Sequence, residues 1–399
     1  TYTEAEGDQI GPYTLRQQIG EGGFGTVWMA EQTGAISRMV ALKVVKAGMD
    51  TRQVLSRFEA ERQALAMMDH PNIARILDAG ATPAGRPYFA MDLVKGVPIT
   101  EFCREQKLGP RRSLALFQDV CSAINHAHQK GIIHRDLKPS NVMVTLEADR
   151  PVVKVIDFGI AKATHSKLTE KTLFTRFEQF LGTPVYMSPE QASMSNLDVD
   201  TRSDIYSLGV LLYELLAGAP PFDQKSLLSA GYDEMRRIIA EDEPPKPSTR
   251  CTETQSGTAT ATATETGNKT GSKPKQSPVS SAALKGDLDW IVMKAIEKDR
   301  TRRYETANAF AADIERFLED EPVLAAAPSA AYRFKKFARR NKAALGVAAA
   351  MVLLLLAGIA ATGWQAVRAT AEKDRATKAR EEAEAISKFL VDMFGKAQP

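Results

Sequence analysis

The chain has 399 residues and a formal net charge of +3 at pH 7, with 44% hydrophobic and 25% charged residues. This length predicts two or three structural units, and the composition allows a sizeable core, which excludes a chain that is disordered throughout. So small a net charge argues neither for nor against a nucleic-acid partner. The three cysteines, Cys103, Cys121 and Cys251, lack metal-site or redox spacing and indicate a reducing compartment. Without an N-terminal signal peptide, the first part of the chain is expected to stay in the cytoplasm.

A strand from Tyr13 follows the polar, loose tail of residues 1–12 and runs into a glycine-rich stretch. The glycines of this stretch are Gly20, Gly22 and Gly25. They let a hairpin backbone approach phosphate oxygens without side-chain interference. The G-x-G-x-x-G pattern also fits a Rossmann turn, which would lead into a helix. Here residues 26–30 continue as a strand, which favours the hairpin.

The next predicted strand, residues 39–45, carries a lysine in an otherwise apolar run. Ala41 and Lys43 lie on one face of this strand by its two-residue period. A lysine in an apolar strand is costly unless it is paired. We therefore expect Lys43 to meet nucleotide phosphates rather than to lie on a solvated edge.

Residues 132–141, with the sequence IIHRDLKPSN, form a short loop between apolar runs. Asp136 can orient a hydroxyl and accept its proton, and Lys138 can neutralise charge on a moving phosphoryl group. Asn141 and Asp157, which opens a D-F-G triplet, offer oxygen ligands to Mg²⁺. H-R-D alone would fit a basic surface loop equally well. The whole phrase with D-F-G at this spacing favours metal-assisted phosphoryl transfer to a hydroxyl.

These motifs resemble those of the eukaryotic-like bacterial transmembrane Ser/Thr protein kinase family, whose catalytic loop reads H-R-D-x-K-x-x-N. The resemblance covers roughly residues 13–318 and implies an α+β bilobal fold. The small β-rich N-lobe would occupy residues 13–94 and the large helical C-lobe residues 95–318. The implied cofactors are ATP and Mg²⁺, or Mn²⁺ in its place. The implied nucleotide-binding residues are Gly20, Gly22, Gly25, Val27, Ala41, Lys43, Met91, Asp92, Val94 and Met143.

A helix is predicted from Thr51 to Met68 by its apolar spacing. Within it, Glu61 matches the family's glutamate that pairs with the strand lysine, and Glu59 is then a solvated acid. Met91 matches the gatekeeper at the end of a strand that runs into the hinge. By the same resemblance, the backbone of the next hinge residues, Asp92 and Val94, binds adenine.

A helix from Leu114 to Gln129 precedes the catalytic loop, and its histidines, His126 and His128, are expected to pack or to face solvent. Short strands are predicted at 142–144 and 153–156. The nearly all-apolar stretch from Asp204 to Leu216 predicts a buried helix. By resemblance this helix anchors the large lobe, and Asp204 bonds back to the catalytic loop.

The 34 residues from Asp157 to Glu190 resemble an activation segment. Ser188 stands where the family usually has alanine before Pro-Glu, and Arg303 matches the arginine that pairs with Glu190. Because Arg135 precedes the catalytic aspartate, the resemblance implies activation by phosphorylation of one copy by another; the alternative is a constitutively active enzyme. The candidate phosphorylation sites are Thr172 and Thr175, followed by Thr169 and Ser166. Thr183 is instead expected to contact the catalytic aspartate and Lys138.

Residues 251–281 are rich in Thr, Ala, Gly, Lys and Pro, and they predict a disordered insertion in the lobe because they cannot form a core. A basic juxtamembrane segment follows at 319–342, with six basic and no acidic side chains in its last eleven residues. The 22 uncharged residues at 343–364 are long enough to cross a hydrocarbon core of about 30 Å; a buried soluble helix is the alternative. The basic cluster places its side in the cytoplasm and attracts anionic lipid.

Residues 365–399 are charged and alanine-rich, and their apolar residues recur in alternating three- and four-residue steps. This spacing predicts a helix outside the membrane, as a short coiled coil or the start of a helical repeat. Because the chain begins at Thr1 and stops abruptly at Pro399, we expect a longer protein.

Together these features predict a membrane-anchored, ATP-dependent protein Ser/Thr kinase in signal transduction, with no nucleic-acid partner. Lys138 and Thr183 favour Ser/Thr over Tyr substrates by family pattern. A pseudokinase receptor is the first rival, but it usually lacks one of Lys43, Asp136 and Asn141, and all three are present. A small-molecule kinase is the second, but it typically lacks the Gly-Thr-Pro…Pro-Glu segment found in this chain.

Overall fold

The computed structural model describes residues 4–22, 25–34, 37–45, 67–158, 184–193, 199–252, 281–327 and 329–395. The chain divides into two compact units, Thr1–Pro328 and Ser329–Pro399. Glu59, Glu61 and most of the predicted helix from Thr51 to Met68 lie outside the described residues. So do residues 159–183, with the candidate phosphorylation sites and Thr183.

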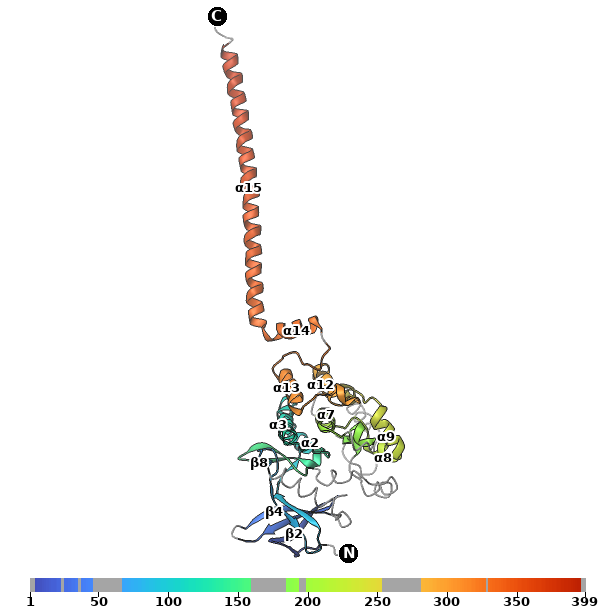
Figure 1. The fold of residues 1–399 in the computed structure, drawn as a ribbon. Helices are drawn as coiled ribbons and strands as arrows, with labels where there is room; N and C mark the ends of the chain where they lie inside the picture. The colour runs from blue at the N-terminus through green and yellow to red at the C-terminus, as the bar shows by residue number, and fades with distance from the viewer. Residues whose placement is uncertain are drawn as a thin grey trace, which may run out of the picture. The chain divides into compact units, whose positions relative to one another are not determined.

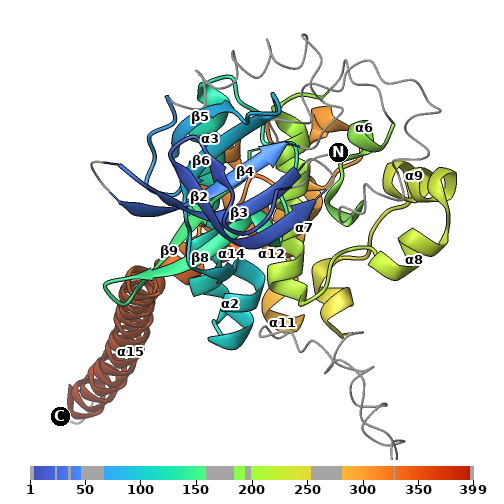
Figure 2. The ribbon, with the colours of Figure 1, turned by 90° about the horizontal axis from the view of Figure 1, so that it is seen from below.

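The first unit begins with a six-stranded antiparallel sheet in the order β1-β2-β3-β4-β6-β5. Its strands are β1 (Gln9–Ile10), β2 (Tyr13–Gly22), β3 (Gly25–Gln32), β4 (Arg38–Val45), β5 (Ile76–Ala81) and β6 (Pro87–Asp92). β2, β3 and β4 lie side by side in Figure 2. One face buries a cluster of its own that includes Trp28, Val40 and Leu42. Ala41 and Met91, on the other face, belong to the core of the helical lobe, so the alternation predicted for β4 is confirmed.

The helical lobe is built around α7 (Thr201–Ala217), of which 14 of 17 residues are buried. The Asp200 side chain accepts a hydrogen bond from the Arg202 N–H at its start, and Gly218, with φ of 77°, ends it in the left-handed conformation that glycine adopts freely. A Cβ at Gly209 would lie 2.8 Å from the Ala295 Cβ, so α12 can approach only a glycine there. The predicted buried helix is confirmed.

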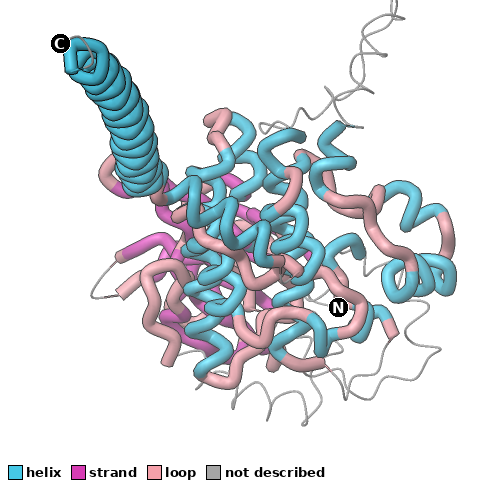
Figure 3. Tube along the Cα trace, turned by 90° about the horizontal axis from the view of Figure 1, so that it is seen from above, coloured by secondary structure: helices cyan, strands magenta, loops and turns pink. Residues whose placement is uncertain are grey.

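Helices, cyan in Figure 3, predominate in this lobe, and in Figure 1 the other helices of the lobe lie at the same end of the unit as α7. They are α2 (Ile99–Glu105), α3 (Pro110–Gln129), α6 (Pro189–Ala192), α8 (Gln224–Ser229), α9 (Tyr232–Glu241), α11 (Ser281–Leu284), α12 (Asp287–Ala295) and α13 (Ala307–Leu318). Single 3-10 turns lie at η1 (Pro139–Asn141), η2 (Pro184–Tyr186) and η3 (Arg300–Arg302). In Figure 1 the strands gather at one end of this unit and the helices at the other. The predicted bilobal α+β fold is thereby confirmed.

A three-stranded sheet, β7 (Val97–Pro98), β8 (Val142–Glu147) and β9 (Arg150–Val155), holds the catalytic loop against the helical lobe. The two predicted strands, 142–144 and 153–156, are therefore arms of one longer hairpin. Its turn places Ala148 and Asp149 at φ of 48° and 61°. Two left-handed central residues match the twist of a tight hairpin. The first of them, Ala148, is not a residue typical of turns, so the sequence did not predict the hairpin.

Several predicted boundaries differ from the structure. α3 begins at Pro110, four residues before Leu114, because proline suits the first turn of a helix. The tail expected to be loose contributes β1, where Ile10 is buried. Cys251, at the edge of the predicted insertion, is buried in the lobe. The first unit also continues past Leu318.

Residues beyond α13 pack with the first unit through Asp313. The buried carboxylate of Asp313 accepts hydrogen bonds from the Leu324 N–H at 2.6 Å and the Ala325 N–H at 2.9 Å. Val323 is buried beside them. The first part of the segment predicted as juxtamembrane therefore belongs to the folded unit.

The second unit contains α14 (Ala330–Arg340) and α15 (Lys342–Gly395). Among the described residues, the stretch Lys342–Val391 of α15 is the one helix long and apolar enough to cross a membrane, by length and composition. The helix runs without interruption through the predicted span, 343–364, and on into the predicted helical segment after it.

Candidate active site

Two polar side chains of the loop 132–141, those of Lys138 and Asn141, lie against Asp136. The Lys138 Nζ lies 2.9 Å from the Asp136 Oδ2. The Asn141 Nδ2 donates to the Asp136 backbone carbonyl at 2.8 Å and to its Oδ2 at 3.2 Å. A carboxylate held by an ammonium and an amide has a fixed orientation and stays a proton acceptor. The sequence predicted this grouping of Asp136, Lys138 and Asn141.

Asp204 fixes the backbone before Asp136. Its carboxylate accepts hydrogen bonds from the His134 N–H at 2.7 Å and the Arg135 N–H at 2.8 Å, as predicted. The His128 Nε2 lies 2.8 Å from the same carboxylate. Burial alone would raise the pKa of Asp204, but the hydrogen bond from His128 and the neighbouring donors outweigh it and lower that pKa. An ionised acceptor therefore supports the loop.

His128 is a site residue that the sequence analysis missed. The expectation that it packs or faces solvent holds as packing, because its side chain on α3 is buried against Asp204 of α7, but its polar role was not predicted. Its place in the last turn of α3, six residues before His134, was the available signal. Without knowledge of how α3 packs on α7, that signal fits a surface residue equally well.

The His134 ring is neutral and links the catalytic loop to the strand that leads into D-F-G. The Asp136 N–H donates to the His134 Nδ1 at 3.3 Å, so the proton lies on Nε2, which is 3.1 Å from the Ile156 carbonyl. Burial lowers the pKa of His134 and favours this neutral form. The ring also packs against Phe158, with centroids 4.6 Å apart.

Two non-glycine residues beside the site adopt left-handed backbone conformations, Arg135 at φ of 62° and Asp157 at φ of 60°. Such conformations persist only where their surroundings hold them. Arg135 is held from both sides, since its N–H donates to Asp204 and its carbonyl accepts from the Gln191 Nε2 at 3.0 Å. Gln191, which the sequence analysis missed, thus ties α6 to the loop.

Lys43, on β4, contacts the carboxylate of Asp157 directly through its Nζ. This ion pair joins the sheet to the D-F-G triplet. The Ile156 N–H donates to the Asn141 carbonyl at 2.9 Å, which keeps Asn141 and Asp157 on adjacent segments. The Asn141 amide nitrogen is engaged with Asp136, whereas its oxygen accepts only a long hydrogen bond from the Ser140 Oγ at 3.5 Å and can serve as a ligand. An amide oxygen and a carboxylate suit Mg²⁺, so the residues present fit the implied metal.

The nucleotide-binding residues predicted in the sheet share one face. Val27 pairs with Lys43 across β3 and β4, and Ala41 pairs with Met91 across β4 and β6. Since Ala41 and Lys43 are two residues apart, all four point to the side of the helical lobe. Val94 follows in the hinge, and Met143 on β8, opposite Pro98, is half-buried.

At the hinge, the Asp92 N–H donates to the Arg75 carbonyl at 3.0 Å. Arg75 also pairs with the Asp92 carboxylate, its Nε lying 3.1 Å from the Oδ2. Since that N–H is engaged, an adenine contact at Asp92 would use its carbonyl. This refines the expectation that the backbone of Asp92 and Val94 binds adenine.

The glycine-rich hairpin offers a matched pair of substitutions, Gly25→Ala and Gly22→Ala. The two glycines face each other across β2 and β3. A Cβ at Gly25 would overlap the backbone carbonyl of Val44, whereas a Cβ at Gly22 meets nothing within 4 Å. We expect Gly25→Ala to destabilise the hairpin by about 1–3 kcal/mol and to weaken nucleotide binding. Gly22→Ala should leave the free energy of unfolding, measured with urea, close to that of the parent, and an equal loss of stability in both variants would contradict the steric argument.

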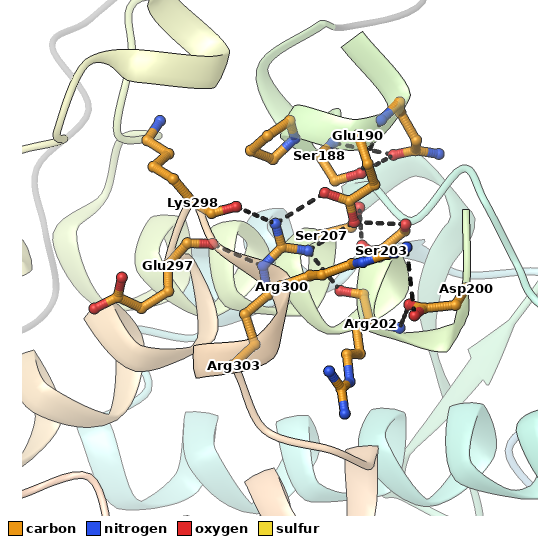
Figure 4. Close-up of polar contacts among 12 residues, drawn as sticks. Ser188, Glu190, Asp200, Arg202, Ser203, Ser207, Glu297, Lys298, Arg300 and Arg303 are labelled. Atoms are coloured by element: carbon orange, nitrogen blue, oxygen red, sulfur yellow. Dashed lines mark hydrogen bonds and ion pairs between the residues drawn. The ribbon is translucent and has the colours of Figure 1, made fainter. Parts of the chain in front are cut away.

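A buried ion pair joins α6 to the residue that ends η3 (Figure 4). Arg303 binds Glu190 in a bidentate manner, with Nη1–Oε1 at 2.7 Å and Nη2–Oε2 at 2.9 Å. The side chains are 0% and 9% exposed, respectively. Ser203 donates to the Glu190 Oε1 at 2.7 Å. The remaining guanidinium bonds go to the carbonyls of Glu297, Lys298 and Arg202.

The predicted pairing of Glu190 with Arg303 is therefore confirmed. Burial alone would raise the pKa of Glu190, but the hydrogen bonds and charge of Arg303 outweigh it and lower that pKa. The carboxylate stays ionised in a buried position because every oxygen has a donor.

Ser188, the departure from the family's alanine, has a local structural reason. It is the N-cap of α6, where its Oγ accepts from the Gln191 N–H and its own N–H donates to the Gln191 Oε1 at 3.0 Å. This capping box satisfies two otherwise unpaired donors. The same Gln191 supports Arg135, so the serine is compatible with the site.

Residues 13–313 match the protein kinase domain family, and the chain belongs to this family. It is 36% identical over 316 residues to the serine/threonine-protein kinase PknB of Mycobacterium tuberculosis, covering 78% of this chain and 43% of that protein. It is also 36% identical over 293 residues to the serine/threonine-protein kinase pkn3 of Myxococcus xanthus, covering 73% of this chain and 51% of that protein. The chain thus spans about half the length of these relatives or less.

Among solved structures, the fold is similar to that of the PknI kinase domain of Mycobacterium tuberculosis. The TM-score is 0.54 at 24% sequence identity, and the superposition covers 79% of this chain and 99% of that one. At this identity the likeness supports the bilobal kinase fold alone. The expected family and fold are both confirmed.

Proposed function

We propose that the chain is a membrane-anchored protein Ser/Thr kinase that transfers the γ-phosphoryl group of ATP to Ser and Thr hydroxyls of proteins. The observation that carries this proposal is the catalytic loop, where Asp136 is held by Lys138 and Asn141. Lys43 and Asp157 face each other from the two lobes. A loop of this composition does little covalent chemistry itself and works by positioning and electrostatics.

In this proposal Asp136 orients the substrate hydroxyl and accepts its proton, while Lys138 neutralises charge on the phosphoryl group. Lys43 anchors the nucleotide phosphates, and its expected partner is Glu61, which lies outside the described residues. Asn141 and Asp157 would hold Mg²⁺, or Mn²⁺, which when bound offsets the charge of the phosphates. The nucleotide would lie between the glycine-rich hairpin and the hinge.

The two rival functions predict different outcomes with the same reagents. A pseudokinase would bind ATP without transfer, and a small-molecule kinase would not label protein. The test is to incubate the full chain with γ-labelled ATP, Mg²⁺ and a mixed protein substrate, and then to separate the phosphoamino acids. Labelled phosphoserine and phosphothreonine are expected. ATP binding without label in any protein, this chain included, would reject the proposal.

Membrane anchoring by α15 rests on the uncharged stretch 343–364. Trp364 closes this stretch, and the Arg368 guanidinium lies 5.5 Å from its ring. Tryptophan is enriched at membrane interfaces, and an arginine beside it can extend its charged end to the lipid headgroups. Lys342 marks the opposite end, about 33 Å away at 1.5 Å per residue, which matches a hydrocarbon core of about 30 Å.

The topology follows from the basic residues before the span, which favour the cytoplasmic side. We expect protease added outside sealed cells to trim only residues after Arg368 and to leave the catalytic unit intact. Leu354→Arg should cost about 3 kcal/mol of insertion free energy at the centre of the span. Digestion of the catalytic unit from outside would show that the orientation is wrong.

Residues 253–280 are expected to be dispensable for catalysis. The residues that flank this segment, Thr252 and Ser281, are hydrogen-bonded to each other. The Thr252 Oγ1 donates to the Ser281 Oγ at 3.0 Å, and the Ser281 Oγ donates to the Ser248 carbonyl at 2.9 Å. Because the two ends are this close, a short Gly/Ser linker can join them without strain. The shortened protein should keep its labelling rate within a few-fold. A loss of rate in folded protein would show that the segment takes part in substrate binding.

Self-association and phosphorylation of one copy by another remain part of the proposal. They rest on Arg135 beside Asp136 and on the candidate sites Thr172 and Thr175, which lie outside the described residues. Membrane tethering raises the effective concentration of one copy around another.

A further inference from the structure

The helix α14 separates its side chains into two faces. It has 11 residues, and its small and aromatic side chains recur at i, i+1, i+4, i+7 and i+8, which places them on one stripe. This apolar face consists of Ala330, Ala331, Phe334, Phe337 and Ala338. The opposite face consists of Tyr332, Arg333, Lys335, Lys336, Arg339 and Arg340.

The apolar face of α14 is open to solvent within the structure. Phe334 is 66% exposed and Phe337 is 53% exposed. Two neighbouring aromatic side chains bury a large area when they find an apolar environment. Such a pair on one helix face points to an interaction surface.

The sequence around α14 carries charges of a single sign. Arg333, Lys335, Arg339 and Arg340 are exposed. The sequence contains no Asp or Glu from residue 322 to residue 371. An acidic protein surface would satisfy the basic face alone, whereas an anionic bilayer offers charge to the basic face and an acyl boundary to the phenylalanines.

The chain turns between α14 and the candidate span. Asn341, at φ of −110° and ψ of 33°, caps α14, and its N–H donates to the Phe337 carbonyl at 3.0 Å. α15 begins at the next residue, Lys342. Figure 1 shows α14 lying crosswise to α15. If α15 crosses the bilayer, a helix that runs crosswise directly before it follows the membrane surface.

We propose that α14 is an in-plane anchor that lies in the surface of an anionic bilayer. Phe334 and Phe337 enter the boundary of the acyl chains, and the exposed basic side chains of α14, which do not include the buried Lys336, meet lipid phosphates. Docked in this way, α14 sets the depth at which α15 enters the membrane. The inference rests on the proposed membrane span.

Site-directed fluorescence can test this placement in the full chain. Cys103, Cys121 and Cys251 are all buried, so a thiol-reactive environment-sensitive dye should label a newly introduced exposed cysteine selectively. Phe337→Cys reports the apolar face and keeps Phe334 as an anchor, and Arg339→Cys is the matched position on the opposite face. Leu354→Cys reports the middle of the proposed span.

The labelled proteins would be reconstituted in vesicles of phosphatidylcholine with phosphatidylglycerol. We expect iodide in the water to quench the dye at position 337 several-fold less than at 339, and nitroxide-labelled acyl chains to quench it several-fold more. The contrast should shrink in phosphatidylcholine alone or at high salt, where the headgroup attraction is weakened.

The Leu354→Cys protein distinguishes a failure of the in-plane anchor alone from a failure of the proposed membrane span. A shielded dye at 354, with equal iodide quenching at 337 and 339, overturns the in-plane anchor and leaves the span intact. A dye at 354 that is open to iodide overturns both the span and the anchor.

Discussion

Asp136→Asn is expected to lower the rate of phosphoryl transfer by about 10²–10⁴-fold, the usual contribution of a general base. The substitution keeps the size of the side chain but removes the proton acceptor and the ion pair with Lys138, whose Nζ lies 2.9 Å away. Nucleotide binding should be largely kept, because Lys43 and Asp157 are untouched. The measurement is label transfer from ATP to protein, beside calorimetric titration with ATP.

Asp149→Asn is the matched control for this experiment. Asp149 lies exposed in the β8–β9 turn at φ of 61°, a conformation that asparagine accepts readily. The Asp149→Asn protein should therefore transfer phosphate at the parental rate and unfold at the parental temperature. An Asp136→Asn protein that is as active as Asp149→Asn would refute the role of Asp136.

The polar groups of the site could be predicted from the sequence where they lie close together along the chain. Asp136, Lys138 and Asn141 share one loop, so their spacing alone predicted their meeting. The alternation of Ala41 and Lys43 on β4 followed from the two-residue period. These are local regularities that need no tertiary information.

Residues that depend on helix packing could not be placed in this way. His128 supports Asp204 only because α3 lies against α7, and Gln191 reaches Arg135 only because α6 docks beside the loop. Neither contact can be predicted from the spacing of residues along the chain. Likewise, the sequence predicted two short strands in place of the β8–β9 hairpin because Ala148 carries no turn signal, although it adopts φ of 48°.

Arg303→Met should destabilise the fold strongly. It would leave the Glu190 carboxylate buried without the guanidinium that binds both of its oxygens. Removing one partner of a buried ion pair typically costs about 3–5 kcal/mol, because the other charge is left uncompensated. The free energy of unfolding, measured with urea, should fall by that amount.

The exposed Arg237, which lies 2.7 Å from both Glu234 and Asp242, supplies the control for Arg303→Met. Arg237→Met removes the same kind of contact on the surface, where water replaces it, and should hardly move the urea midpoint. Combining Arg303→Met with Glu190→Leu removes both charges and should recover part of the lost stability. Equal effects of Arg303→Met and Arg237→Met would show that the buried pair has no special energetic role.

Glu190→Gln gives the pH dependence of the same pair. Because the folded-state pKa of Glu190 is lowered, its ionised form stabilises the fold above the ordinary carboxyl pKa of about 4.3. That contribution is lost as the pH falls through the lowered folded-state value. We therefore expect the parent to be more stable than Glu190→Gln at neutral pH, with the difference shrinking toward acid pH. A difference that stayed constant from neutral to acid pH would mean that the charge of Glu190 is not what stabilises this contact.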